Sequence, residues 1–158
     1  MASNKLLTFS SIVSIVAGLA MVIGGIGGII YTYQSIVAES ITTTKDATIP
    51  NTPVRGPLTL KAQADVILMH TLTTTEGKRF SQMPRTIPEL DEVGNPVVDE
   101  KGEPVMVPNE KRSAWFNSVT LMTALELGML TYAFSALSVL LGFLFLLNGY
   151  VFHALKKS

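Results

Sequence analysis

The chain has 158 residues, 47% of them hydrophobic, with twelve Lys and Arg balanced by twelve Asp and Glu and with no cysteine. The chain therefore has no excess of basic residues, which nucleic-acid-binding proteins usually have, and we expect no nucleic-acid partner. The absence of cysteine excludes disulfides and thiolate-ligated zinc as stabilising links in this chain.

Two long apolar runs, residues 9–33 and 127–152, contain no charged residue. Each holds roughly 20 residues or more, and at about 1.5 Å rise per residue this is enough helix to cross a hydrocarbon core of about 30 Å. We therefore predict a membrane protein, mainly α, in which a two-transmembrane-helix hairpin carries a small α+β segment at residues 34–126. A cleaved signal peptide is the alternative for the first run, but that run is longer than a usual signal core.

The distribution of charge predicts the orientation of this hairpin. The tails, residues 1–8 and 153–158, carry basic residues and no acidic ones, whereas residues 34–126 carry nine Lys and Arg against twelve Asp and Glu. Cytoplasmic flanks of membrane helices are enriched in Lys and Arg. We expect a bacterial plasma-membrane protein whose termini are both cytoplasmic and whose residues 34–126 are extracytoplasmic.

Small residues recur every seven positions in both apolar runs. The first set is Ser11, Gly18, Gly25 and Thr32, and the second is Gly128, Ser135, Gly142 and Gly149. A seven-residue period drifts by only about 20° per repeat on an ideal helix, so each set forms one narrow seam. Small residues allow membrane helices to approach closely, and we expect the seams to pack on each other, to receive helices of other proteins, or both. Gly24 and Gly28 form a further G-x-x-x-G pair.

Between the runs, the sequence predicts a tether followed by a helix. The threonine-rich residues 34–51 are expected to form an extended tether. Pro57 suits a first helical turn, and the residues after it share an apolar helical face, which predicts a helix over 57–72. The same residues also partly alternate between apolar and polar, so a strand is the rival interpretation.

The remainder of this segment contains an eight-residue echo and a second helical pattern. Gly94-Asn95-Pro96-Val97-Val98 is repeated as Gly102-Glu103-Pro104-Val105-Met106, with Asp99-Glu100-Lys101 between the copies. This pattern predicts a β-hairpin over 93–107. Ser113 is the expected N-cap of a helix over 113–126 that runs into the second apolar run.

The sequence offers little catalytic chemistry. His70 and His153 would lie on opposite sides of a membrane, so they cannot share a metal ion within one copy, and a non-haem iron site needs two histidines and a carboxylate. No P-loop, nucleophile elbow or dinucleotide fingerprint occurs, and the acidic residues Glu89, Asp91 and Glu92 do not match a calcium loop. We therefore expect no enzymatic activity and no cofactor of its own.

Several short motifs resemble a family of small two-span membrane proteins from actinobacteria. They are Val54-x-Gly56-Pro57-Leu58-Thr59, Ala62-Gln63-Ala64 with Ile67 and His70, Thr75-x-Gly77-Lys78, and Phe116-Asn117-Ser118. The similarity covers most of the chain, with an addition from about Glu89 to Pro108. Members often carry the name of aromatic ring-opening dioxygenases, which the separation of the two histidines argues against here.

The resemblance implies an accessory subunit of the actinobacterial respiratory supercomplex, in which a cytochrome bcc complex is joined to an aa3-type oxidase. In that case the lipid bilayer and the membrane subunits of the complex are the partners, and any haem, copper or quinone belongs to those subunits. The alternative is an independent two-span envelope adaptor or sensor that homodimerises.

Overall fold

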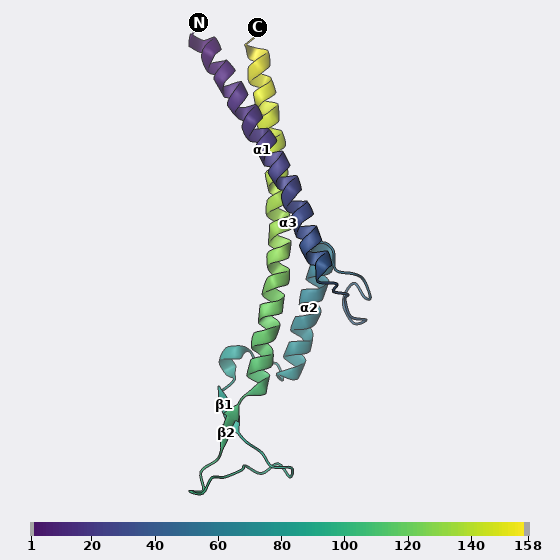
Figure 1. The fold of residues 1–158 in the computed structure, drawn as a ribbon, viewed down its shortest axis with the longest axis vertical. Coiled ribbons are helices and arrows are strands. Elements are labelled where there is room, and N and C mark those ends of the chain that lie inside the picture. The colour runs from purple at the N-terminus through teal and green to yellow at the C-terminus, as the bar shows by residue number, and fades with distance from the viewer. Residues whose placement is uncertain (1, 157–158) are drawn as a thin grey trace.

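The computed structural model describes residues 2–156, which are mainly helical. Its elements are α1 (Ala2–Ala38), α2 (Pro57–Thr74), the short 3-10 helix η1 (Phe80–Gln82), β1 (Thr86–Pro88), β2 (Met106–Pro108) and α3 (Glu110–Leu155). The helices α1 and α3 lie antiparallel and side by side, and α2 lies beside the N-terminal half of α3 (Figure 1). Both chain ends lie at one end of this elongated molecule, and the strands lie at the other, which we call the distal end.

The helices α1 and α3 are long and apolar enough to cross a membrane. At 1.5 Å per residue their 37 and 46 residues span about 56 and 69 Å. In the most apolar 18-residue stretch of α1 only 17% of the residues are buried, and in that of α3 only 11% are buried. The core helix of a soluble protein, in contrast, is mostly buried. Large side chains such as Ile23 and Leu140, 69% and 63% exposed, therefore have no protein cover in this chain.

The helix α3 is continuous and begins earlier than the sequence indicated. Asn109 is its N-cap, and the side-chain Oδ1 of Asn109 accepts hydrogen bonds from the backbone N–H groups of Lys111 and Arg112, at 3.1 and 3.4 Å. The carboxylate of Glu110 lies in the first turn, where it complements the helix dipole. Ser113, the expected N-cap, is therefore inside the helix, and the expected helix 113–126 and apolar run 127–152 are parts of one element.

The helix α2 starts with the signals expected of it. Gly56 is its N-cap, Pro57 occupies the first turn, and the Thr59 hydroxyl accepts a hydrogen bond from the Gly56 N–H at 3.1 Å. It ends at Thr74, two residues beyond the expected helix 57–72, and residues 57–74 do not form the rival strand. Leu60 and Ala64 of α2 join Val54 and Leu125 in a small hydrophobic core.

Residues 39–56 form a folded loop rather than an extended tether. The Thr43 side chain is buried; its hydroxyl donates to the Ile49 carbonyl oxygen at 2.5 Å and accepts from the Thr52 N–H at 2.9 Å. Threonine side chains that bond nearby backbone groups in this way stabilise compact turns. Ile41, near the start of the loop, packs against the core, and Val54, near its end, is part of the core, so both ends of the loop are held in place.

The distal end differs from the expected single hairpin over 93–107. β1 and β2 pair antiparallel with Ile87 opposite Val107, so the chain before the expected hairpin supplies one of the two strands. Beyond this ribbon the two copies of the echo form two separate loops, closed by the bridges Leu90–Pro96 and Val98–Pro104.

An aspartate and a glycine explain why each copy of the echo closes on itself. The Oδ1 atoms of Asp91 and Asp99 each accept two backbone N–H groups from the residues that follow, and Gly94 and Gly102 have φ angles of 92° and 82°. Asx turns and left-handed glycines both favour tight reversals. The proline in each copy has no N–H group to extend a ladder of strands.

Candidate functional site

The two small-residue seams face each other where α1 and α3 cross. A Cβ atom placed on Gly18 would lie 2.7 Å from the Gly142 carbonyl oxygen, and one on Gly25 would lie 2.7 Å from the Ser135 carbonyl oxygen. A Cβ on Gly149 would lie 2.6 Å from Ile15 Cγ1. Real Cβ atoms essentially never approach within 3.0 Å, so these glycines are what allows the two backbones to come this close.

Two hydrogen bonds cross the same interface. The Ser11 hydroxyl, at one end of the first seam, donates to the Gly149 carbonyl oxygen at 2.8 Å. The Ser138 hydroxyl donates to the Met21 carbonyl oxygen at 3.0 Å. Such bonds between membrane helices contribute about 0.6–2 kcal/mol each. Ser138 lies outside the seven-residue pattern, so only the observed crossing of the helices brings it to the interface.

The other glycines expected to pack, the G-x-x-x-G pair and Gly128, have different neighbours. A Cβ on Gly28 would lie 2.5 Å from Ser135 Oγ, whereas Gly24 has nothing within 4 Å and faces away from α3. The expected G-x-x-x-G pair is therefore divided between two faces of α1. Gly128 lies against α2, where an added Cβ would lie 3.3 Å from Leu60 Cδ1.

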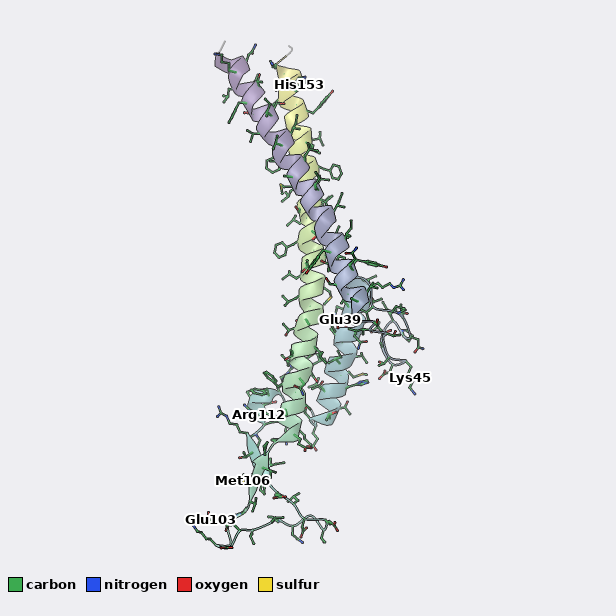
Figure 2. All side chains as sticks on the ribbon, viewed as in Figure 1. Glu39, Lys45, Glu103, Met106, Arg112 and His153 are labelled. Carbon is green, nitrogen blue, oxygen red and sulfur yellow. The ribbon has the colours of Figure 1, made fainter. Side chains whose placement is uncertain are left out.

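His70 pairs with a loop carboxylate. Its Nε2 lies 2.5 Å from the Asp46 Oδ2, which links α2 to the loop 39–56. A hydrogen bond from Thr44, followed by the one from His70, lowers the pKa of Asp46 to about 2. Within residues 2–156, no group of three or more His, Cys, Asp or Glu is placed to hold a metal ion. His153 lies near the chain ends (Figure 2), in the last turn of α3, whereas His70 belongs to α2.

Comparison with family models, curated proteins and solved structures gave no match. Function is therefore argued from the residues of this chain and their arrangement.

An open pocket at the distal end was not indicated by the sequence. It has a volume of about 390 Å³ and is lined by Phe80, Arg85, Asn109, Arg112, Ser113, Phe116 and Asn117. We call it the arginine pocket; Arg112 lies near the distal start of α3 in Figure 2. Its residues come from η1, from the link before β1 and from the first turns of α3, so only the fold brings them together.

The arginines here have no acidic partner. The Arg112 guanidinium lies 3.8 Å from the centre of the Phe80 ring, and its Nε is buried without a hydrogen-bond partner. Arg79 lies 5.6 Å from the Trp115 ring centre. In the part of the chain that the structure describes, neither these two arginines nor Arg85 forms an ion pair.

The neighbouring lysine shows a contrasting arrangement. Lys111 Nζ lies 2.6 Å from Glu76 Oε1, and this bond joins the end of α2 to the start of α3. The hydrogen bond from Lys111, together with its charge, lowers the pKa of Glu76. Glu76 is thus already paired with a lysine, and no carboxylate of the described residues forms an ion pair with the guanidinium groups of the arginine pocket, which are left available to an anionic group.

An acidic arm extends beyond the arginine pocket. Residues 89–105, which we call the arm, project past β1 and β2 and lie away from the helices (Figure 1). The arm carries Glu89, Asp91, Glu92, Asp99, Glu100 and Glu103, with Lys101 as its single basic residue. Several of its apolar side chains are open to solvent; Val93 is 85% exposed and Leu90 is 59% exposed.

Proposed function

We propose that this chain is a non-catalytic accessory subunit of a larger membrane complex, anchored as a two-helix hairpin and bound to its partner at the distal end. The observation that carries the proposal is the arginine pocket, where the buried Nε of Arg112 has no acceptor. A buried donor without a partner destabilises a protein by about 1–3 kcal/mol, and more when the group is charged. A carboxylate of a neighbouring subunit would satisfy it and would find Arg85 beside it.

The membrane anchor is supported by the uncovered apolar faces of α1 and α3. In the proposed arrangement both termini are cytoplasmic, and the loop, α2, the arginine pocket and the arm are extracytoplasmic. The two chain ends already lie at the same end of the molecule (Figure 1). Lys5 and Lys156 then flank the cytoplasmic surface, as the preference for basic cytoplasmic flanks requires.

The identity of the complex rests on the sequence resemblance alone. It leads us to propose the actinobacterial cytochrome bcc–aa3 supercomplex, with haem, copper and quinone held by the partner subunits. In this arrangement the chain stabilises the assembly and takes no part in electron transfer.

Purification from the native membrane in a mild detergent tests this function. We expect the tagged chain to copurify with proteins that show b-, c- and a-type haem spectra. Arg112→Gln should reduce the recovered haem at least tenfold, since a buried charged hydrogen bond contributes about 1.5–3 kcal/mol. Arg55→Gln, at an exposed arginine outside the pocket, is the matched control. Recovery of the wild-type chain without haem proteins would contradict the proposal.

The outward face of α1 favours a second candidate, a homodimeric envelope adaptor. Gly24 and Gly27 are exposed with no atom near their Cβ positions, so a second copy could approach this face closely. The chain contains no cysteine, so Gly24→Cys provides a single reactive site. Efficient disulfide-linked dimers in native membranes would favour the adaptor, whereas monomers would favour the accessory subunit.

A further inference from the structure

An open, mainly apolar groove lies where α1 ends, α2 begins and the middle of α3 passes both. It has a volume of about 580 Å³, and Ile36, Leu60 and Leu127 are among its aliphatic walls. Tyr31, which is 72% exposed, lies on its rim. Tyrosines favour the boundary between hydrocarbon and water, and α1 leaves its apolar run here. In the proposed hairpin, the groove therefore lies at the level of lipid headgroups.

Several polar side chains line this groove. The hydroxyl groups of Thr32 and Thr131 already donate to carbonyl oxygens of their own helices, whereas an amide oxygen and a carboxylate have no partner among the described residues. Gln63 Oε1 is buried and has no hydrogen-bond partner among the described residues. The Glu39 carboxylate also lines the groove and forms no ion pair with any described residue, and Figure 2 shows it beside the top of α2. No Lys, Arg or His of the described residues lines the groove. A complementary ligand must bring hydrogen-bond donors and positive charge to these two groups, and an apolar part to the walls.

We propose that this groove binds one phospholipid with a primary ammonium headgroup, such as phosphatidylethanolamine. The ammonium group donates to Gln63 Oε1 and to the Glu39 carboxylate, and an acyl chain lies along the aliphatic wall towards Leu127. This inference rests on the membrane hairpin of the proposed function and not on the identity of the complex. A lipid bound in this way links α2 to the membrane surface beside the hydrophobic core.

The volume of the groove, about 580 Å³, is that of a small-ligand site, and it accommodates a headgroup and the start of an acyl chain. Sites for small molecules usually enclose about 300–1,000 Å³. The backbone of a partner helix would leave Gln63 Oε1 without a donor, because the N–H groups in a helix interior are already bonded.

Native mass spectrometry of the delipidated full-length chain in dodecyl maltoside tests the proposal. Phosphatidylethanolamine, phosphatidylcholine and phosphatidylglycerol are added in equal amounts. Phosphatidylcholine carries the positive charge but has no N–H donor, and phosphatidylglycerol carries a net negative charge. We expect one phosphatidylethanolamine per chain, retained about tenfold more than phosphatidylglycerol, with phosphatidylcholine between them.

Two variants and one control connect this selectivity to the groove. Gln63→Leu removes the acceptor, so it should lower the affinity for phosphatidylethanolamine about tenfold while raising the unfolding temperature of the lipid-free chain. Gly128→Leu should fill the groove and prevent the binding of any of the three lipids. Gly27→Leu, the control, adds the same side chain where nothing lies within 4 Å and should leave binding unchanged.

Equal binding of the three lipids, or an unchanged preference in Gln63→Leu, would overturn the lipid site. Flotation with liposomes tests the membrane hairpin separately. A chain that floats but shows no lipid preference would refute this inference alone, and a chain that does not float would refute the hairpin of the proposed function.

Discussion

Adding one methyl group at Gly142 tests how closely α1 and α3 pack. The new Cβ of Gly142→Ala would lie 2.8 Å from the Gly18 carbonyl oxygen, 2.9 Å from the Val22 nitrogen and 2.7 Å from Val22 Cγ2. Two of these are backbone atoms, and the third belongs to a β-branched side chain that has one preferred rotamer in a helix. Ordinary contact begins at 3.4 Å, so the helices must separate locally by about 0.6 Å.

This separation sets the expected loss of stability. A gap of about 0.5–1 Å removes a quarter to a half of each dispersion contact, and overpacking of this kind costs about 1–3 kcal/mol. Alanine also has a higher helix propensity than glycine, by up to about 1 kcal/mol in water. Gly24→Ala gains the same propensity without a clash, because nothing lies within 4 Å of its Cβ. The difference between the two variants therefore isolates the contact, and we expect Gly142→Ala to be less stable by about 1–3 kcal/mol.

The assay is unfolding by SDS titrated into dodecyl maltoside micelles. Dyes on cysteines introduced at Leu6 and Val151, both exposed, report the separation of α1 from α3 by energy transfer, and the natural chain has no cysteine to interfere. Gly142→Ala should separate at a lower SDS fraction than Gly24→Ala. If both variants separate at the same SDS fraction, the close contact at Gly142 does not exist in solution and the reasoning is wrong.

Three further predictions concern the register of α1 and α3, the loop and the start of α3. Gly28→Cys with Ser135→Cys should form an intramolecular disulfide, since their Cβ atoms would lie 3.4 Å apart, close to the usual range of about 3.5–4.5 Å; Gly24→Cys with Ser135→Cys should not, and equal yields would contradict the register. Asp46 has a pKa lowered from 3.8 to about 2, so its contribution to stability is complete above about pH 4 and is lost as pH falls towards 2. The difference in unfolding temperature between the wild type and Asp46→Asn should therefore be constant above pH 5 and shrink below pH 4; a difference independent of pH would contradict the hydrogen bonds of Asp46 with Thr44 and His70. Asn109→Ala should destabilise the distal end by about 1 kcal/mol through loss of the N-cap, measured by thermal unfolding followed by the fluorescence of Trp115, and Ser113→Ala should have a much smaller effect.

The sequence indicates the helical elements well because their signals are local. Long runs without charge, Pro57 in a first turn and small residues at a seven-residue period are all properties of neighbouring positions on one helix. The apolar run 9–33 lies within α1, and the expected helix 57–72 lies within α2. The face of α1 that meets α3 depends on both helices together. The sequence therefore indicates Gly24 and Gly28 as one packing pair, although only Gly28 faces α3.

The distal end could not be derived in the same way. A repeat such as the echo is compatible with two strands of one hairpin or with two separate loops, and the choice depends on whether residues 86–88 are free to pair with residues 106–108. Ser113 was the wrong N-cap; the cap is Asn109, and an asparagine followed directly by an acidic residue, Glu110, is a usual signal of a helix start. The arginine pocket joins residues 80–85 to residues 109–117, and no periodicity within either segment predicts that contact.

The length of α3 explains how a small distal segment can be ordered without disulfides. A separate domain of this size would bury little surface, and the hydrophobic core found among the described residues has four buried members, Val54, Leu60, Ala64 and Leu125. Leu125 belongs to α3, so the core is built on a helix that is already formed along its contact with α1. The Tyr132 hydroxyl, about two turns further along α3, donates to the Arg55 carbonyl oxygen at 2.8 Å and connects the start of α2 to the same helix. Changes that separate α1 from α3 should therefore also loosen α2, so Gly142→Ala should lower the unfolding temperature reported by Trp115 although the two residues are about 40 Å apart along α3. A Trp115 transition unaffected by Gly142→Ala would show that the distal segment folds independently of the hairpin.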